Sequence, residues 1–252
     1  MKACIIIPHY DHVEQFRDFL PTLVAIGLPL VVVDDASPDS AMDELARLLQ
    51  THAPNASLVR HSHNRGKGDA VMTGIRFALG VGFSHALQID ADGQHDVSDV
   101  SAFLDIASSR PNNIVCGQPV FDESISALRY YARQITLSFC CMETLSNEIR
   151  DALCGFRLYP LRGIVGILDQ SRLGERMAFD PEILVRAVWA GIPLHFIPIR
   201  VSYPEGGRSH FHYFRDNLEI SWMHTRLLFG MLIRFPRLVR QNRVRRRKGL
   251  AV

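Results

Sequence analysis

A short apolar run is followed at once by two carboxylates at residues 87–96, LQIDADGQHD. The apolar residues predict a buried strand over 85–89, with Asp90 and Asp92 at its carboxyl end. In open α/β sheets, ligands bind at that edge, and Gly93 allows a turn that brings both acids to one crevice. Such carboxylates bind Mg²⁺ together with substrate phosphates, whereas the alternative is an acidic turn that caps the next helix.

A second acidic pair favours the ligand-binding interpretation. Asp34 and Asp35 follow the apolar run at 30–33, which also predicts a buried strand. Two such pairs in one sheet indicate a crevice for a cation, a ribose or both. The Gly-Lys-Gly loop at 66–68 adds backbone amides and one ammonium group that can approach phosphate oxygens.

Three common nucleotide or nucleophile motifs are absent from the sequence. The loop around Lys67 is not a Walker A loop, because no Gly stands at the required upstream spacing and no Ser or Thr follows the lysine. No strand is followed by Gly-x-Gly-x-x-Gly, so a dinucleotide Rossmann site is not expected. The Gly-x-Ser-x-Gly nucleophile elbow is also missing.

Apolar runs typical of strands alternate with segments of helical periodicity along most of the chain. Asp69, Ser98 and Asp180 stand where they would cap three helices, and Gly191 is expected to close the helix that Asp180 opens. This alternation predicts an α/β fold with a doubly wound, mostly parallel sheet and helices on both faces. The strands are predicted at 3–7, 30–33, 57–61, 85–89, 114–116 and 193–201.

The composition is that of an ordinary globular protein, with 47% hydrophobic and 21% charged residues among 252. The net charge of +2 is unevenly spread, because eight basic residues and no acid lie between 234 and 248. A basic tail on an acidic body indicates an anionic partner for the tail. The five cysteines lack metal-ligand spacing, so we expect reduced thiols in a cytosolic protein. Neither a signal peptide nor a membrane-spanning segment is expected.

Five motifs, in the same order along the chain, resemble glycosyltransferase family 2 and in particular its dolichyl-phosphate sugar synthase-like branch. The resemblance covers about residues 2–210. It implies a GT-A-type fold and transfer of a sugar from a nucleotide-sugar donor, with inversion at the sugar carbon. The motifs are IPHY at 7–10, VDDASPD at 33–39, NRGKG at 64–68, DADGQH at 90–95 and DALCGFR at 151–157.

The resemblance also implies roles for individual residues. The metal, Mg²⁺ or Mn²⁺, is expected at Asp92, Gln94 and Asp90, where it would neutralise the developing diphosphate and make Asp92 a catalytic residue. Asp151 is the candidate base. Arg157 is the candidate partner of an anionic acceptor. The nucleotide-sugar is expected to contact Pro8, Tyr10, Asp34, Asp35, Lys67, Asp90, Arg208 and His210.

Two positions depart from the pattern of the family. Asp11 and His12 stand where the opening motif usually continues with Asn-Glu. Late in the chain, this branch tends to have Gly-x-Ser-Lys, whereas this sequence has GRSH at 207–210. Either Arg208 or His210 would steady the leaving diphosphate, and His210 would do so fully only when protonated. The alternative is an exposed basic turn.

The motifs and the tail together favour a polyprenyl phosphate or another membrane-associated acceptor. Basic residues interleaved with apolar ones at 226–240 predict an amphipathic helix on an anionic membrane surface, and the alternative is a helix packed on its own body. Nucleic acid is not expected as a partner, because no aromatic stacking platform accompanies the arginines. The protein is therefore expected to be cytoplasmic and peripheral on the inner face of a membrane.

The predicted domain organisation has a catalytic domain at 1–210 and an amphipathic basic extension at 211–252. The catalytic domain divides into a nucleotide-sugar half at about 1–118 and an acceptor half at about 119–210. An apolar helical stripe at 128–142 is expected to pack in the core or to line an acceptor groove. Three alternatives remain: a nucleotidyltransferase of similar fold, a glycosyltransferase with a hydroxyl acceptor on a glycan or lipid, and a non-catalytic membrane-binding protein.

Overall fold

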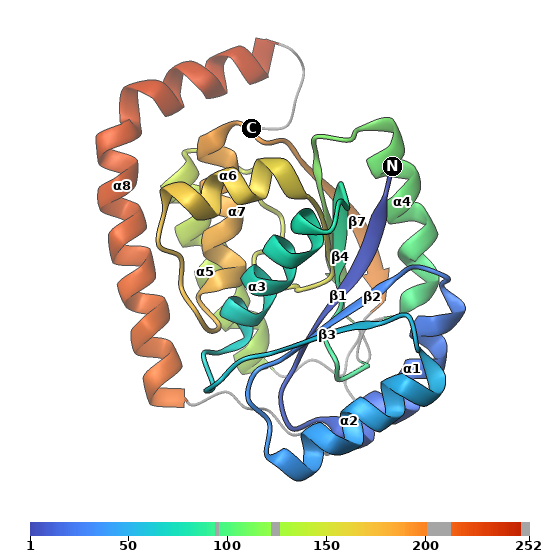
Figure 1. The fold of residues 1–252 in the computed structure, drawn as a ribbon. Coiled ribbons are helices and arrows are strands. Elements are labelled where there is room, and N and C mark those ends of the chain that lie inside the picture. The colour runs from blue at the N-terminus through green and yellow to red at the C-terminus, as the bar shows by residue number, and fades with distance from the viewer. Residues whose placement is uncertain (94–95, 122–126, 201–212, 248–252) are drawn as a thin grey trace.

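The computed structural model describes residues 1–93, 96–121, 127–200 and 213–247, which form a seven-stranded sheet between helices (Figure 1). The strands lie in the order β3-β2-β1-β4-β6-β5-β7. Among the described strands, β6 alone runs antiparallel to its neighbours, β4 and β5. The strands are β1 (Ala3–His9), β2 (Leu30–Asp34), β3 (Ser57–Arg60), β4 (His85–Gln88), β5 (Ile114–Val120), β6 (Arg157–Pro160) and β7 (Leu194–Arg200).

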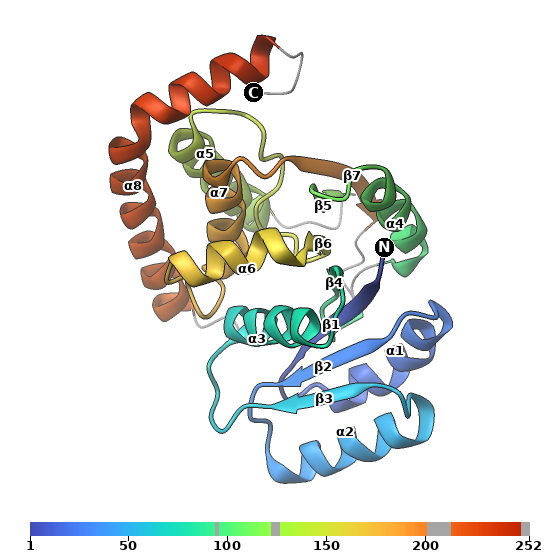
Figure 2. The same ribbon diagram turned by 45° about the horizontal axis from the view of Figure 1, so that its top comes forward.

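Side chains alternate across the central strand β1 and divide the interior into two hydrophobic layers. Ile5 and Ile7 point into the layer that helices α1, α2 and α4 cover, whereas Cys4 and Ile6 point into the layer below α3, α5, α6, α7 and α8 (Figure 2). The helices are α1 (Val13–Ala25), α2 (Asp39–His52), α3 (Lys67–Gly80), α4 (Val100–Ser109), α5 (Ala127–Thr144), α6 (Leu161–Gln170), α7 (Phe179–Ala190) and α8 (Tyr213–Arg247).

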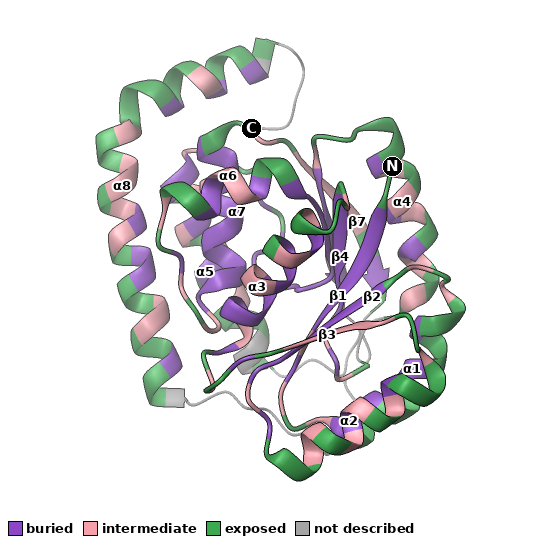
Figure 3. Ribbon diagram, viewed as in Figure 1, coloured by how far each residue is buried: buried purple, intermediate pink, exposed green. Residues whose placement is uncertain are grey.

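The predicted α/β class is confirmed, because a mostly parallel sheet is covered by helices on both faces. Figure 3 shows that the central strands are buried, which is why they read as continuous apolar runs. The predicted strands are all present, but β6 was not predicted. This strand is only four residues long and starts with a charged residue, Arg157, so it carries no apolar run of its own.

Two predicted helix caps are wrong. Helix α3 begins at Lys67, after Gly66 with a φ of 99°, so Asp69 lies in the first turn and not at the cap. Asp96 caps the 3-10 turn (Val97–Asp99) before α4, because its side chain accepts a hydrogen bond from Ser98 N at 2.9 Å. In both cases an earlier residue begins the turn.

The predicted start of α7 is also wrong, although its predicted end is confirmed. The helix begins at Phe179, so Asp180 lies inside the first turn. There its carboxylate approaches Lys67 and Arg157 instead of the backbone amides of the helix. Gly191 closes the helix in the left-handed conformation, with a φ of 82°.

The apolar stripe of α5 was expected to pack in the core or to line an acceptor groove, and its described side chains do not pack in the core. Tyr131, Ile135 and Met142 are 65%, 60% and 47% exposed. Phe139 alone among the described side chains of the stripe makes an inward aromatic contact, because it stacks on His224 of α8 at 4.8 Å. The buried side of α5 carries polar groups and Cys140 instead, so apolar periodicity identified the outer side of this helix.

The predicted C-terminal helix is confirmed as α8, which runs along the outside of the α5, α6 and α7 layer and then bends (Figures 1 and 2). Pro236 lies inside it, and a proline removes one helical hydrogen bond and kinks the helix. One side packs on the body through Met223, Leu227 and Leu238, all nearly fully buried. The alternative that this helix packs on its own body is therefore confirmed for this side.

Polar contacts fix α8 at several points along its length. His224 Nδ1 lies 2.7 Å from Glu143 Oε1, and the Asn242 amide donates to the carbonyl of Leu145 at 2.8 Å. The opposite side of α8 is apolar and open to solvent. Among the described residues, no helix is long and apolar enough to span a membrane. The exposed apolar side chains are Phe214, Leu218, Trp222, Phe229, Leu232, Ile233 and Phe235.

Candidate active site

Carboxylates and one lysine meet at the carboxyl end of β4. Lys67 Nζ lies 2.8 Å from Asp90 Oδ2 and 3.2 Å from Asp180 Oδ2, and its side chain is 22% exposed. Burial alone would lower the pKa of Lys67, but the Asp180 and Asp90 carboxylates outweigh it and raise that pKa, with a smaller contribution from Asp92. Lys67 therefore stays charged beside the predicted metal-binding acids.

Arg157 lies directly behind this cluster and is fully buried. Its guanidinium group donates to the carbonyl of Asp180 at 2.6 Å and to the carbonyl of Ala152 at 2.8 Å. Asp180 Oδ1 lies 3.8 Å from Arg157 Nη1. Direct contact between Arg157 and an acceptor does not fit this placement, so we assign it the role of holding the loop and the carboxylate.

Asp151 forms a two-pronged ion pair with Arg133, a residue of α5 that the sequence analysis did not single out. Arg133 Nη2 lies 2.7 Å from Asp151 Oδ2, and Arg133 Nε donates to the same oxygen at 3.1 Å. Asp151 Oδ1 also accepts from Leu153 N and Cys154 N at 3.0 and 2.7 Å, so it caps the turn that follows. The pair lines a pocket of about 170 Å³ with Phe121 and other residues.

Gly155 joins the acceptor-side loop to the carboxylate cluster. A Cβ atom at this position would lie 2.9 Å from Lys67 Nζ and 3.0 Å from Asp90 Oδ2. Gln88 Nε2 would lie closer still, at 2.8 Å, so the position favours a residue without a side chain. Lys67, Asp90 and Gly155, each from a different motif, thus meet at one place.

We expect Gly155→Ala to lower the turnover rate by about 10²-fold, because the added methyl group pushes Lys67 away from Asp90. The free energy of unfolding should change by only about 1 kcal/mol, since the contacted atoms are the ends of flexible side chains. Urea unfolding and steady-state kinetics measure the two effects. Gly166→Ala is the control, because no atom lies within 4 Å of its added Cβ. Equal activity of both variants would contradict this reading of the site.

Asp34 lies fully buried at the end of β2 and is held by its neighbours. Ser37 Oγ donates to Asp34 Oδ1 at 2.5 Å, and His9 Nδ1 lies 3.1 Å from the same oxygen. Burial alone would raise the pKa of Asp34, but the hydrogen bonds with His9 and Ser37 outweigh it and lower that pKa. In the turn between Asp34 and Ser37, Ala36 has a φ of 61°, a strained value for a residue with a side chain.

Asp35 connects the end of β2 to the loop that carries Lys67. Its Oδ1 accepts from Arg65 N at 2.8 Å, and its Oδ2 accepts from Gly66 N at 2.6 Å. His61 Nδ1 lies 2.8 Å from Asp35 Oδ1. The two acids of this pair therefore shape the loops of the site, and their contact with a nucleotide stays a prediction.

The remaining predicted contacts lie at the same edge or outside the described residues. Pro8 is near the end of β1, and Tyr10 follows that strand directly; both are partly exposed. Gln94, Arg208 and His210 lie outside the part of the chain that the structure describes. Their predicted roles stay predictions.

The donor atoms around Asp92 fit a hard divalent cation. Asp90 and Asp92 both supply carboxylate oxygens at this end of β4, and Lys67 contacts one oxygen of Asp90. Their role as metal ligands stays a prediction. In the described part of the chain, no three His, Cys, Asp or Glu side chains are grouped to hold a metal ion. A cation of the magnesium type is typically bound by one or two carboxylates together with substrate phosphates.

Comparison with known proteins places the chain in a family. The model of Glycosyl transferase family 2 matches residues 4–163, more than half of the chain. The chain belongs to this family. Its enzyme class, glycosyltransferase, and the predicted resemblance are therefore confirmed, and Asp34, Lys67, Asp90 and Asp151 all lie within the matched residues.

Curated relatives of this family-2 chain are named for transfer to lipid phosphates. A dolichyl-phosphate beta-glucosyltransferase of Dictyostelium discoideum is 29% identical over 91% of this chain and 74% of its own length. The human protein of the same name is 30% identical over 73% of this chain and 59% of its own length. A polyprenol monophosphomannose synthase of Mycolicibacterium smegmatis is 26% identical and covers 82% of this chain and 80% of its own length.

Solved structures of similar fold support the GT-A type. A mannosyltransferase from Pyrobaculum calidifontis in complex with GDP-Man and Mn²⁺ has a TM-score of 0.58 and 18% identity, covering 92% of this chain and 64% of that one. TarS of S. aureus in complex with UDP-GlcNAc has a TM-score of 0.53 and 16% identity, covering 90% and 66%. At these identities the likeness shows the fold alone.

Proposed function

We propose that this family-2 glycosyltransferase moves a sugar from a nucleotide-sugar donor to a polyprenyl phosphate, with inversion at the anomeric carbon. One observation carries the proposal: a single loop, 151–157, joins the carboxylate cluster at Asp90 to a pocket lined by Arg133. A donor site and an anion site thereby lie next to each other. The names of the dolichyl-phosphate and polyprenol relatives support the same acceptor class.

The charges of the cluster argue for a divalent cation with the donor. Lys67 and Arg157 lie close to Asp90 and Asp180, so these four groups nearly neutralise one another. An arriving diphosphate therefore needs further positive charge. We propose that Mg²⁺ or Mn²⁺ supplies it at Asp92, with Gln94 and Asp90 beside it. Pro8, Tyr10, Asp34, Asp35, Lys67, Asp90, Arg208 and His210 are the proposed donor-binding residues.

The acceptor is proposed to bind in the pocket that Arg133 and Arg150 line. A phosphate monoester carries between one and two negative charges at neutral pH, because its second pKa is about 6. The guanidinium fork of Arg133, which holds Asp151 in two-pronged geometry here, suits a phosphate equally well. An acceptor phosphate would therefore compete with Asp151 for this arginine.

The chemical step needs little proton transfer if the acceptor is a phosphate. An oxygen of the acceptor attacks the anomeric carbon, the bond from that carbon to the donor diphosphate breaks, and the nucleoside diphosphate leaves with the electron pair. The acceptor oxygen is already an anion, so no base is needed to remove a proton. Asp151 would instead position Arg133 and the turn that follows. With a hydroxyl acceptor, the alternative, Asp151 would act as the base.

The proposed domain organisation follows from the separation of donor-binding and acceptor-binding residues along the chain. Residues 1–118 would bind the nucleotide-sugar, and residues 119–210 would bind the acceptor. Residues 211–252 would form the extension that includes α8. We further propose that α8 lies on an anionic membrane surface from the cytoplasmic side, because its exposed side carries seven large apolar residues and arginines follow along the helix.

Replacing Phe229 and Ile233 of α8 together by Ser is expected to weaken binding to anionic vesicles by about tenfold or more. These side chains are 65% and 80% exposed, and burying one large apolar side chain is worth about 1.5–3 kcal/mol. Vesicle flotation at low and high salt measures the effect. The control replaces Val24 and Val81, exposed apolar residues elsewhere, by Ser. If both double variants bind as the intact protein does, this side of α8 does not meet the membrane.

The function is tested with a panel of labelled nucleotide-sugars, a polyprenyl phosphate and Mn²⁺. The expected products are a polyprenyl-phosphate sugar and a nucleoside diphosphate. Release of pyrophosphate would identify a nucleotidyltransferase instead. Transfer to a glycan or lipid hydroxyl, without transfer to the lipid phosphate, would replace the proposed acceptor by the hydroxyl alternative.

A further inference from the structure

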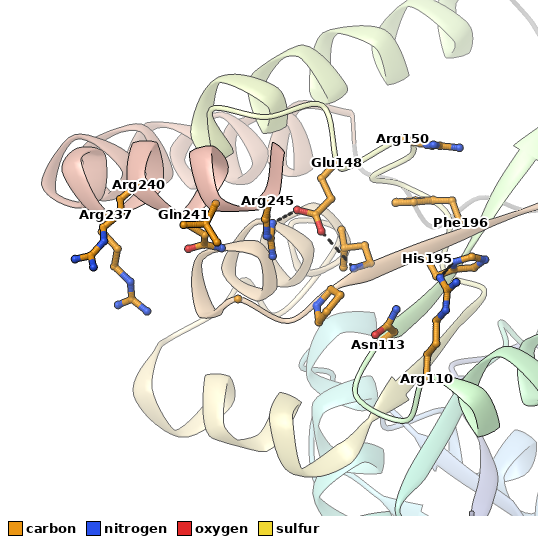
Figure 4. Close-up of a pocket in the computed structure, with 14 residues that line it drawn as sticks. Arg110, Asn113, Glu148, Arg150, His195, Phe196, Arg237, Arg240, Gln241 and Arg245 are labelled. Atoms are coloured by element: carbon orange, nitrogen blue, oxygen red, sulfur yellow. Dashed lines mark hydrogen bonds and ion pairs between the residues drawn. The ribbon is translucent and has the colours of Figure 1, made fainter. Parts of the chain in front are cut away.

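A second cavity, larger than the pocket beside Asp151, lies between the last turns of α8 and the starts of β5 and β7. Its volume is about 650 Å³. Figure 4 shows Arg237 and Arg240 on α8 at one end, and Arg110 beside His195 at the other. β5 and β7 run parallel to each other and start at the edge of the sheet opposite the carboxylate cluster. The cavity is therefore separate from the proposed donor site.

The lining of this cavity is strongly basic. Glu148 is the acid among its lining residues, and it already pairs with Arg245 and accepts from Leu194 N at 3.4 Å. Within the described residues, no carboxylate forms an ion pair with the other arginines. Four exposed arginines therefore line one cavity without a carboxylate partner among the described residues. The lining arginines are Arg110, Arg150, Arg237, Arg240 and Arg245.

His195 lies next to two of these arginines, and its protonation is affected by them. Arg110 Nη1 donates to His195 Nδ1 at 3.0 Å, which requires this nitrogen to be unprotonated. Burial, Arg110 and Arg150 together lower the pKa of His195. A bound anion would offset the two arginines, and the pKa of His195 would then rise.

The size and chemistry of the lining point to a phosphate group. Arginine forks bind phosphate oxygens in two-pronged geometry, and a phosphate monoester or diphosphate brings more negative charge than one carboxylate. The cavity is larger than a phosphate, and Leu194, Phe196 and Val244 give it an apolar wall. We propose that this cavity is a second ligand site, which binds a phosphate monoester or diphosphate borne by a lipid or by a small soluble molecule.

This site does not depend on the proposed function, although one residue lines both the new cavity and the proposed acceptor pocket. Arg150 lines both this cavity and the smaller pocket beside Asp151. Variants that test the new site therefore leave Arg150 in place. Arg237 and Arg240 are exposed on α8, form no ion pair with another described residue, and are separated from the carboxylate cluster by the sheet.

The test compares two double variants of the full chain that lose the same charge from the same helix. Arg237→Gln with Arg240→Gln removes two lining arginines, and Arg243→Gln with Arg247→Gln removes two exposed arginines outside the cavity. One probe is inorganic pyrophosphate, measured by calorimetry in chelator so that a metal-dependent donor site stays silent. The other is flotation with phosphatidate vesicles, compared with phosphatidylglycerol vesicles of matched charge.

We expect the lining variant to bind at least one probe about tenfold or more weakly than the intact protein, since it loses two charged groups that donate hydrogen bonds to phosphate oxygens. The control variant should keep most of the pyrophosphate binding and of the preference for phosphatidate over phosphatidylglycerol. Loss for pyrophosphate indicates a soluble ligand, and loss of the preference for phosphatidate indicates a lipid headgroup. Pyrophosphate should also raise the pKa of His195, followed by NMR, less in the lining variant. Equal effects of both variants, or no effect, would overturn the proposal.

Discussion

Asp92→Asn is expected to lower the rate of sugar transfer by about 10²–10³-fold and to leave the fold intact. Asp92 lies just beyond β4, and its charge reaches Lys67 at the centre of the cluster. Because the charges of Lys67 and Arg157 are balanced by Asp90 and Asp180, the leaving diphosphate needs further positive charge, and we propose that a cation bound with the help of Asp92 supplies it. Removing one group that stabilises developing charge typically costs about 10²–10³ in rate.

The control for this variant is Asp105→Asn, which makes the same change on the exposed side of α4. It should transfer sugar at the rate of the intact enzyme. Chelator should stop the intact enzyme, and added Mn²⁺ or Mg²⁺ should restore it. Full activity in chelator, or an Asp92→Asn variant that stays active, would show that the cluster works without a divalent cation.

The sequence predicted the inner strands β1, β2 and β4 well because they are buried on both faces. Residues 3–7 and 30–33 are continuous apolar runs, and they are the central strands β1 and β2. β6 escaped prediction because it is short and contains Arg157, a charge that only tertiary contacts make tolerable. The antiparallel direction of β6 is set by the path of the chain, and it cannot be predicted from the sequence of the strand itself.

Helix faces were harder to predict than strands. The apolar stripe of α5 was expected to pack in the core or to line an acceptor groove, yet Tyr131 and Ile135 lie outside the core, 65% and 60% exposed. Periodicity identifies an apolar side of a helix but not what covers it. α8 has an apolar side on the body and another open to solvent, and the sequence pattern alone cannot separate these two sides.

The site shows the same division between local and tertiary information. The motifs singled out Lys67, Asp90 and Asp151, and the fold brings Lys67 and Asp90 together at the end of β4 beside the loop that Asp151 begins, while their predicted roles stay predictions. Asp180 was taken for a helix cap, and Arg133 had no local signal at all. Both are recognised only by the partner that the fold brings to them, which is a residue distant in the chain.

Arg133→Gln is expected to lower transfer to a polyprenyl phosphate by about 10–10²-fold, and more than Asp151→Asn does. The guanidinium group of Arg133 faces the small pocket beside Asp151, and a hydrogen bond to a charged group is worth about 1.5–3 kcal/mol. Asn at 151 keeps an oxygen that accepts from Leu153 N and Cys154 N, so the turn should survive. Arg157→Ala, by contrast, should destabilise the fold, because it removes the buried hydrogen bonds to the carbonyls of Asp180 and Ala152.

The comparison of these variants decides the acceptor class. A hydroxyl acceptor must lose a proton as it attacks, so loss of the Asp151 carboxylate would then cost about 10²–10⁴ in rate, whereas an acceptor phosphate needs no base. Steady-state rates with both acceptors at several pH values measure the difference. Thermal unfolding and Arg133→Lys, which keeps the charge but loses the fork, separate binding from folding. If Asp151→Asn is inactive while Arg133→Gln stays active, the acceptor is a hydroxyl group, and Asp151 is its base.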